Sequence, residues 1–434
     1  MKKHIKLFIV LGIILVGSFS FYLFKGYKKD ALVYENNKIK PSSSGIAMML
    51  ETSAGSGNYE MTTRSEWPTE GYVFNANLSK CENGSELSWD NENKKVLMSG
   101  NKSDKCYVYF VVYVKQRFDQ SCNDNTLACH TAKLYTGTQG ANNIYYHDAN
   151  LTNGAGDNSY RYAGASDQVN NYVCFGSSTT PCPADNLYRI IGVFGDKVKL
   201  IKSDYATTAL LGTDGDYKQA YTATGYSSSS YKGNNLANIA AYTWNYKNNT
   251  TINSGYGSNT WSTSLLNKTN LNKNFITNIG ADWAAKIDMT TWKVGGNTWA
   301  NIGTQPAKTA YQNEIVSPVT TNSTDSATEY SAKIGLMYAS DYGFAAAPSS
   351  WTANLNTYNG KAINNVNWMY MGLAEWTISR TADRAYNAFY VNNTGHVSIE
   401  RAHYALALRP VFYLTSSVNY VSGSGTAADP ISIN

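Results

Sequence analysis

The clearest pattern of apolar and polar positions lies near the C-terminus, in residues 385–401. Residues 385–391 are small, aromatic or β-branched, and after them the polar positions 396, 398 and 400 alternate with Val397 and Ile399. A period of two is typical of a strand with one buried face, and the intervening Asn-Asn-Thr-Gly supplies turn residues. This segment therefore predicts a β-hairpin with one dry face and one wet face.

The apolar run that follows, residues 405–414, is interrupted only by Arg409 and Pro410. It predicts one nearly continuous buried strand. A buried Arg409 requires a carboxylate or carbonyl partner. Pro410 has no N–H to donate to a strand ladder, so we expect the strand to lie at an edge or to carry a bulge at this position.

Three earlier segments also have a clear period. Residues 187–202 alternate on both sides of Gly195-Asp196 and predict a hairpin. The apolar residues of 261–287 recur in steps of three to five, which favours one or two short helices packed on a sheet. Residues 333–338 predict a strand that ends at 340–343. This mixture indicates an α+β fold and not a repeat array.

The N-terminal residues 5–24 form an apolar run whose only charge is Lys6, and a helix of this length crosses about 30 Å of hydrocarbon. A cleaved signal peptide is the alternative, but the run is long and ends in aromatic residues without a small-x-small cleavage site. We predict that residues 1–30 are a transmembrane anchor in the lipid bilayer. Residues 31–65 contain PSSSG and SAGSGN, which predict a flexible stalk.

Pairing of neighbouring cysteines is the simplest of the fifteen possible connectivities. The predicted disulfides are Cys81–Cys106, Cys122–Cys129 and Cys174–Cys182. The first encloses two strand-like runs around an Asp-Asn-Glu-Asn turn and predicts a small β module over residues 66–118 that depends on this staple. Residues 119–185 form a connecting region, rich in Gly, Asn and Tyr, that holds the other two pairs.

The alternative to disulfides is a zinc site, which needs closely spaced cysteines with histidine. Only His130 lies near a cysteine, beside Cys129, so we favour disulfides and predict no metal there. Disulfides indicate an oxidising exterior. The predicted location is the cell membrane, with a single pass and the C-terminal bulk outside the cell.

The composition supports an extracellular β-rich protein and excludes a nucleic-acid partner. Charged residues make up 15% of the chain, which has 34 Tyr and 34 Gly. Six of the 36 basic residues and one of the 31 acidic residues lie in residues 1–30, which leaves 30 of each in the rest of the chain. A neutral ectodomain lacks the positive charge that binding to phosphates requires.

Several motifs occur in a fixed order: NLYRIIGVFGDKVKLIKSD, NTWSTSLLNKTNLNKNF, IGLMYASDYGF, EWTISR, GHV and LRPVFYL. Over residues 185–415 this order resembles an uncharacterised family of secreted and surface proteins of gut Firmicutes, and the segment around Cys81 and Cys106 resembles an upstream module of that family. More distantly, Glu375-Trp376-Thr377 and Arg409 are similar to the end of formylglycine-generating-enzyme-like domains. That resemblance implies a C-type-lectin-like fold for residues 186–434, with loops that display a binding surface.

The sequence predicts no catalytic site and no cofactor. The formylglycine-generating enzymes hold copper with two late cysteines, and this chain has none after Cys182. It also has no GxSxG elbow, phosphate loop or HExxH motif. The acidic residues Glu375 and Asp383 are expected to pair with arginines, and we assign structural roles to three side chains, Trp376, Arg380 and Arg409.

Two metal sets were weighed against simpler interpretations. His396 and Glu400 share one face of the predicted strand, whereas His403 falls on the other, so we favour exposed polar histidines over a metal site. A calcium site is compatible with a lectin-like fold, but nothing in the spacing demands it. Its ligands would be Asp341, Asn364, Asn367 and Glu375.

For ligand binding we predict the wet face of the C-terminal hairpin and the loops before it. Aromatic rings stack on sugars or fill protein pockets, and Asn offers paired donors and acceptors. The predicted ligand-binding residues are Asn387, Tyr390, Asn392, Asn393, His396, Trp351 and Trp368. The sequence thus predicts an anchored surface protein that binds a glycan or a protein. The alternatives are an envelope protein that associates with itself and, third, a hydrolase.

Overall fold

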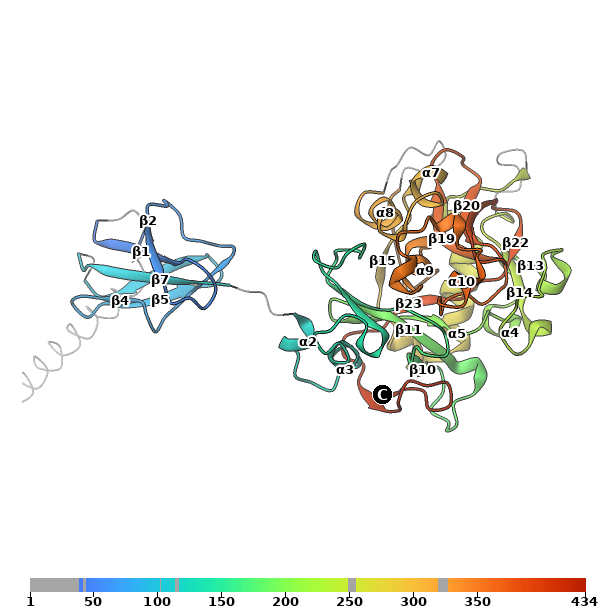
Figure 1. The fold of residues 1–434 in the computed structure, drawn as a ribbon, viewed down its shortest axis with the longest axis horizontal. Coiled ribbons are helices and arrows are strands. Elements are labelled where there is room, and N and C mark those ends of the chain that lie inside the picture. Colours follow the sequence, from blue (N-terminus) through green and yellow to red (C-terminus); the bar gives the residue numbers. More distant parts are fainter. Residues whose placement is uncertain (1–38, 42–43, 102, 114–116, 249–254, 319–326) are drawn as a thin grey trace, which may run out of the picture. The chain divides into compact units, whose positions relative to one another are not determined.

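The fold comes from a computed structural model, which describes residues 39–41, 44–101, 103–113, 117–248, 255–318 and 327–434. The chain divides into two compact units after residue 116, each with its own set of strands (Figure 1). The predicted anchor, residues 5–24, lies outside the described residues. In the part of the chain that the structure describes, no helix has the length and apolar character needed to cross a membrane.

The first unit is built on a five-stranded sheet in which β7 is central. It pairs in parallel with β1 and antiparallel with β3 and β4, and β1 pairs with β2. The strands are β1 (Ile46–Glu51), β2 (Tyr59–Thr62), β3 (Tyr72–Phe74), β4 (Lys80–Cys81) and β7 (Cys106–Val112). A separate hairpin of β5 (Glu86–Asp90) and β6 (Lys95–Ser99) turns at the predicted Asp-Asn-Glu-Asn segment.

The flexible stalk predicted over residues 31–65 is wrong for residues 46–62, because these form β1 and β2. The segment SAGSGN is the loop that joins the two strands. Its glycines, Gly55 and Gly57, have positive φ values of 67° and 66°, as a tight hairpin connection requires. The Gly and Ser residues of this segment form a hairpin turn and not a flexible linker, so the β module begins well before residue 66.

Every second residue of β1 and β7 contributes its side chain to the core of the first unit. Met48, Leu50, Val108 and Phe110 are buried together with Trp67 and Val96. Beta strands place every second side chain on the same face, which explains this spacing.

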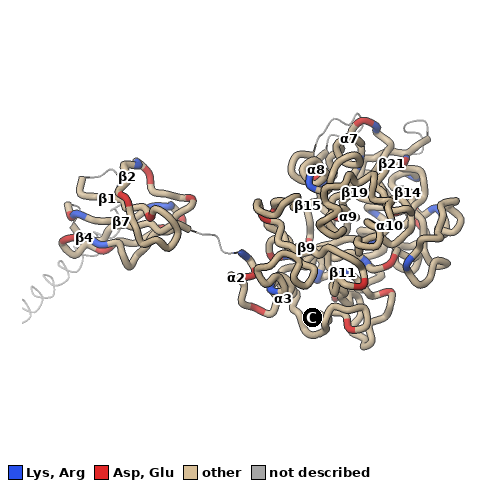
Figure 2. Tube along the Cα trace, viewed as in Figure 1, with Lys and Arg blue, Asp and Glu red and all other residues tan. Residues whose placement is uncertain are grey.

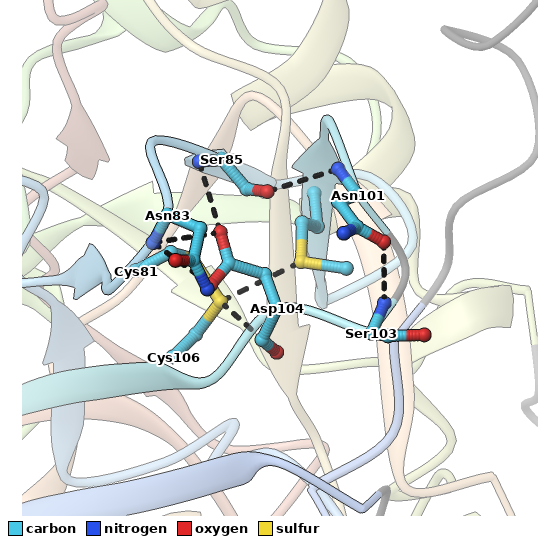
Figure 3. The surroundings of a disulfide bond; sticks show 8 residues. Cys81, Asn83, Ser85, Asn101, Ser103, Asp104 and Cys106 are labelled. Carbon is cyan, nitrogen blue, oxygen red and sulfur yellow. Dashed lines mark hydrogen bonds between the residues drawn. A yellow bond between two sulfur atoms is a disulfide. The ribbon is translucent and has the colours of Figure 1, made fainter.

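The predicted Cys81–Cys106 disulfide is present and joins β4 to the start of β7 (Figure 3). Beside it, the buried carboxylate of Asp104 accepts hydrogen bonds from the backbone N–H groups of Asn83 and Ser85. The Ser85 hydroxyl in turn accepts from the Asn101 backbone N–H. The disulfide and Asp104 therefore fix the same loop from two sides.

The second unit is organised around a seven-stranded sheet whose described pairings are all antiparallel. The order is β18-β23-β12-β11-β9-β8, and β10 pairs with β11. The strands are β8 (Ile144–His147), β9 (Ser159–Tyr162), β10 (Tyr172–Cys174), β11 (Leu187–Phe194), β12 (Lys197–Lys202), β18 (Ile334–Gly335) and β23 (Val411–Tyr413). The predicted hairpin over 187–202, with its turn at Gly195-Asp196, is confirmed as β11 and β12.

The separate connecting region predicted over residues 119–185 is wrong, because it supplies β8, β9 and β10 of this central sheet. The sequence Ser-Tyr-Arg-Tyr of β9 has no aliphatic residue, yet all four side chains are buried. A pattern search for apolar residues misses such a strand. The disulfides Cys122–Cys129 and Cys174–Cys182 are present as predicted and therefore belong to the second unit.

A four-stranded sheet carries the predicted C-terminal hairpin. Its strands are β16 (Gly296–Asn297), β19 (Glu375–Thr381), β20 (Asn387–Val391) and β21 (Val397–Arg401). The hairpin of β20 and β21 turns over residues 392–396 as predicted. However, every residue of β19 and β20 is buried, so the expected wet face is confined to β21.

The predicted continuous strand over 405–414 is two strands in two sheets. β22 (Ala405–Leu406) pairs with β14 (Ala240–Thr243), whereas β23 pairs with β12. The break falls at Arg409-Pro410, and the Pro410 carbonyl accepts a hydrogen bond from the Lys202 N–H at 3.1 Å. Pro410 therefore precedes β23, which lies between β18 and β12 and not at an edge.

Short helices and small sheets complete the second unit. The helical structure predicted within 261–287 is confirmed, but it forms four segments and not one or two. They are η6 (Trp261–Thr263), the π-helix η7 (Leu266–Phe275), α5 (Ile276–Asn278) and α6 (Ala281–Ala285). Of the strand predicted over 333–338, only Ile334–Gly335 forms a strand, β18, and the residues 340–343 at its expected end belong to the helix α9 (Ala339–Phe344).

The remaining helices are α2 (Phe118–Ser121), α3 (Leu127–Lys133), η1 (Ala141–Asn143), η2 (Ala184–Asn186), α4 (Thr208–Leu211), η3 (Tyr221–Ala223), η4 (Leu236–Asn238), α7 (Trp299–Ile302), α8 (Ala307–Tyr311), η8 (Gln312–Val316), η9 (Pro348–Ser350), η10 (Leu355–Thr357) and α10 (Lys361–Asn364). The remaining strands are β13 (Tyr217–Ala220), β15 (Thr290–Lys293), β17 (Glu329–Ala332), β24 (Tyr420–Ser422) and β25 (Ser432–Ile433). The predicted α+β class is therefore confirmed.

The disulfide of the first unit provides a test of its stability. We expect Cys81→Ala/Cys106→Ala to lower the free energy of unfolding of this unit by about 3 kcal/mol, because the bond closes a long loop in the unfolded chain. Hydrogen exchange at the β7 amides, which report on this unit alone, measures the loss. As a control, Cys122→Ala/Cys129→Ala removes a disulfide of the other unit and leaves β7 exchange unchanged. Equal protection of β7 in all three proteins would contradict the assignment.

Candidate functional site

Four of the seven predicted ligand-binding residues lie in the core of the second unit. Trp351, Trp368, Asn387 and Tyr390 are 1%, 0%, 4% and 6% exposed. The indole N–H of Trp368 donates to the Tyr162 carbonyl at 2.9 Å, so this side chain satisfies a backbone group inside the protein. The prediction that all seven side chains gather on one binding surface is therefore wrong.

The other three, Asn392, Asn393 and His396, are half-buried at the tip of the β20–β21 hairpin. The tip is held by neighbouring segments. Asn393 donates through Nδ2 to the Ser227 carbonyl at 3.2 Å, and its own carbonyl accepts from the Tyr370 hydroxyl at 2.8 Å. Burial lowers the pKa of His396. These residues are thus committed to fixing the turn, which leaves little of them for a ligand.

Side chains of the two possible metal sets have other partners in the structure. Among the described residues, no group of three or more His, Cys, Asp or Glu side chains is arranged to hold a metal ion. Glu400 accepts a hydrogen bond from the Tyr226 hydroxyl, and His403 stacks on the Tyr256 ring. In the calcium set, Asp341 contacts Lys199 and Glu375 contacts Arg409, so each carboxylate already has a cationic partner.

The carboxylate expected beside Arg409 is Glu375, and both side chains are buried. Arg409 donates through Nε and Nη2 to the two carboxylate oxygens at 2.8 and 2.9 Å, and Nη2 also donates to the Met369 carbonyl at 2.7 Å. Trp376 donates its indole N–H to the Tyr242 carbonyl at 2.9 Å, and Arg380 donates to the Ala327 carbonyl. All three arginine and tryptophan side chains thus make internal contacts.

A groove of about 620 Å³ lies on the second unit. One wall is the β8–β9 connection and the other is η9. The lining residues are Gln139, Tyr145, Asp148, Asn150, Leu151, Thr152, Asn153, Pro348, Ser349 and Trp351. Of the predicted ligand-binding residues, only Trp351 is among them, and it is a buried part of the floor.

The wall formed by residues 148–153 has a defined turn. The Asp148 carboxylate accepts hydrogen bonds from the backbone N–H groups of Asn150 and Leu151, both at 3.0 Å. Asn153 adopts a φ of 60°, a left-handed conformation that Asn tolerates better than most residues. Asp and Asn are the residues that stabilise such turns through their own backbone, so this short segment holds its shape.

The side chain of His147 stabilises the loop that forms this wall. It is completely buried, and its Nδ1 accepts a hydrogen bond from the Ala155 backbone N–H at 3.0 Å. Its ring lies 5.1 Å from that of Trp351, which meets Tyr145 edge-on at 5.4 Å. Burial, together with the charge of Arg161, holds the pKa of His147 well below its usual range. The neutral ring therefore accepts the Ala155 hydrogen bond at neutral pH.

The lining of the groove is mostly uncharged. Among its lining residues, Asp148 is the one carboxylate, and none is a Lys, Arg, His or Cys. Amide, hydroxyl, aromatic and aliphatic groups make up the rest of the lining. Charges are also sparse elsewhere, and both signs are interspersed along each unit (Figure 2).

Seven of the ten lining residues of the groove fall in the predicted connecting region 119–185, for which no binding role was predicted. The available signal was the Tyr145-Tyr146 pair followed by an Asp/Asn-rich turn at 148–153. The same signal of Tyr and Asn was recognised at the C-terminal hairpin. There, however, the side chains are covered by other segments of the fold.

Comparison with known proteins gives no relative from which a function could be transferred. No protein-family model, no curated protein sequence and no solved structure matches this chain. The resemblances that the motifs suggest therefore stay predictions.

The buried neutral His147 predicts a pH dependence of stability. Its folded pKa is depressed, so the unfolded chain takes up a proton below about pH 6.5 that the folded protein does not bind. Stability is fully present above this pH and falls below it. We expect urea denaturation between about pH 7 and 5 to show this loss, with a slope of up to about 1.4 kcal/mol per pH unit from one proton.

His147→Asn should remove this slope while Asn retains an acceptor for the Ala155 N–H. The matched control is His130→Asn, because burial lowers the pKa of His130 less strongly and its side chain is only partly covered. If His147→Asn and the parent protein lose stability in parallel as the pH falls, His147 is not the group responsible.

Proposed function

We propose that this chain is a membrane-anchored extracellular surface protein whose second unit binds a glycan through the groove between residues 145–153 and 348–351. The observation that carries the proposal is the lining of that groove, in which aromatic and apolar groups stand beside a row of amides and hydroxyls. A protein ligand is the alternative occupant of the same surface.

The groove suits a sugar for two reasons. The C–H face of a sugar ring packs on aromatic or aliphatic groups, which Tyr145, Leu151 and Pro348 supply. Sugar hydroxyls need both donors and acceptors, which Asn150 and Thr152 offer from exposed positions. Its volume of about 620 Å³ lies within the roughly 300–1,000 Å³ that is usual for ligand sites.

The extracellular location is supported by the cysteines and by the N-terminal sequence. All six cysteines are paired in three disulfides, which persist in oxidising environments. Residues 5–24 have the length and apolar character of a single membrane span. A C-type-lectin-like fold for residues 186–434 remains part of the proposal. The pairing of Glu375 with Arg409, two residues of the suggestive motif, supports a shared structural role for that motif.

The groove can be tested directly with a glycan array. We expect the chain without residues 1–30 to bind, and Tyr145→Ala to lower affinity about tenfold, because one aromatic contact contributes roughly 1.5 kcal/mol. Asn393→Ala, at the hairpin tip, is the matched control and should bind like the parent. Circular dichroism verifies that both variants fold.

Two results would reject this assignment. Loss of binding in Asn393→Ala and not in Tyr145→Ala would place the site on the C-terminal hairpin. Silence of the parent protein across the array, with and without calcium, would remove the glycan and leave a protein ligand to be sought.

One observation favours the second candidate function, self-association. The outer face of the five-stranded sheet in the first unit carries apolar side chains, because strand pairing sets Met49 beside Met61 and Tyr109, and Val73 beside Val111. Met61 and Val73 are 69% and 45% exposed. Exposed apolar patches of this kind often mark contact surfaces.

If this face joins two copies, sedimentation velocity of the chain without residues 1–30 should show dimers that increase with concentration. Val73→Lys/Met61→Lys should abolish them, because two buried like charges oppose association across the face. The control Val421→Lys changes an exposed residue of the second unit and should leave the dimer intact. A monomer at all concentrations would exclude this alternative.

A further inference from the structure

A compact group of buried charges lies between the central sheet and α9. Lys199 projects from β12, Asp341 from α9 and Arg161 from β9, and their side chains are 1%, 3% and 2% exposed. Arg161 is paired most closely with Asp157, at 2.6 Å. Buried ion pairs of this kind are costly to desolvate, so their presence calls for an explanation beyond simple stability.

The closest contact in this group joins Lys199 to Asp341. Lys199 Nζ lies 2.5 Å from Asp341 Oδ2, and the ammonium is surrounded by the rings of Phe194, Tyr338 and Tyr413 at 4.8–5.5 Å. Burial in these surroundings lowers the pKa of Lys199, although the charge of Asp341 opposes the shift. A desolvated lysine of this kind is the form that acts as a nucleophile.

Asp341 is held in a fixed orientation. Its Oδ2 also accepts the Tyr338 backbone N–H at 3.0 Å, as part of the capping box that begins α9. Its other oxygen, Oδ1, accepts a hydrogen bond from Arg161 Nη1 at 3.4 Å. A cation on Oδ1 draws electron density from the carboxyl carbon, which is the atom that an amine attacks.

A second carboxyl group keeps the start of α9 in place. Glu314 accepts the backbone N–H groups of Ala339 and Ser340 at 3.0 and 2.9 Å, directly before Asp341. Burial raises the pKa of Glu314. A cavity of about 60 Å³ adjoins the pair and is lined by both Lys199 and Asp341, so there is room for a water molecule.

We propose that Lys199 and Asp341 are joined by an intramolecular isopeptide bond. A proton passes from the ammonium to the carboxylate along their hydrogen bond, which yields an amine and a carboxylic acid in contact. Lys199 Nζ attacks Asp341 Cγ and the C–N bond forms. A second proton then passes from Nζ to Oδ2, the Cγ–Oδ2 bond breaks, and Oδ2 leaves as water with both protons. Oδ1 remains as the amide oxygen beside Arg161. No oxidant, reductant or cofactor takes part.

The contact between the two side chains and the exclusion of bulk water both favour formation of the amide bond. The ammonium of Lys199 and the carboxylate of Asp341 are held in contact by β12 and α9, which removes the entropy cost of bringing the two groups together. Exclusion of bulk water disfavours hydrolysis of the product. The bond would link β12 to α9 across 142 residues of sequence and, unlike the three disulfides, would resist reduction.

Mass spectrometry of the full chain, denatured and with its disulfides reduced, tests the proposal. We expect a mass lower by one water than the sequence requires. Trypsin, which needs a free lysine side chain, should cleave after Lys197 and Lys202 but not after Lys199, and tandem spectra should show a branched peptide that contains both Lys199 and Asp341. Lys197 and Lys202 lie in the same strand and serve as internal controls.

Lys199→Arg keeps the positive charge but cannot form this amide, so it should regain the lost water. Asp341→Ala should do the same. The parent protein decides the matter even if both variants fail to fold. A parent mass that agrees with the sequence, together with cleavage after Lys199, would falsify the bond. A missing water that maps to other residues also overturns it.

Discussion

The buried pair of Arg409 and Glu375 is the interaction on which the second unit depends. Glu375 begins β19 of the four-stranded sheet, and Arg409 lies between β22 and β23, which belong to two other sheets. Backbone hydrogen bonds at 3.0 Å, between Trp376 and Ala407 and between Ala407 and Ala374, fix the same crossing. Because an unpaired buried charge is very costly, the three sheets can meet only in the arrangement that pairs these groups.

Local features of this fold could be predicted from the sequence, whereas burial by distant segments could not. Nearby residues determine the two hairpins, over 187–202 and 387–401, and the three disulfides. Local sequence patterns were therefore sufficient to predict these features. In β19, Thr377 and Ser379 alternate with Trp376 and Ile378, a pattern typical of a strand with one exposed face. In the structure the Thr377 hydroxyl donates to the Phe389 carbonyl and Ser379 donates to Glu314, so both are satisfied inside the protein. Alternation identifies two faces of a strand but cannot show that another layer covers the polar one.

The abundance of asparagine has a structural reason that the composition alone concealed. Asn259 Nδ2 donates to the carbonyls of Thr381, Arg384 and Asn387 at 2.8–2.9 Å, and Asn270 Nδ2 donates to the carbonyls of Leu211 and Asp214. In a unit with short strands and long connections, many backbone groups lack a partner in a ladder and must find one elsewhere. Asparagine side chains therefore supply the hydrogen bonds that regular secondary structure would otherwise provide. For this reason, exposed asparagines could not be recognised as ligand contacts from the sequence.

The parallel pairing of β1 with β7 determines how the first unit would carry a mechanical load. The chain enters this unit at the start of β1 and leaves it at the end of β7, and the two strands are paired from Ile46 with Cys106 to Leu50 with Phe110. Tension along the chain then pulls neighbouring parallel strands past each other. All hydrogen bonds of that ladder resist at once, instead of opening one after another as in a hairpin pulled from its open end. A protein held at its N-terminus and loaded through its second unit would be pulled in this shear geometry.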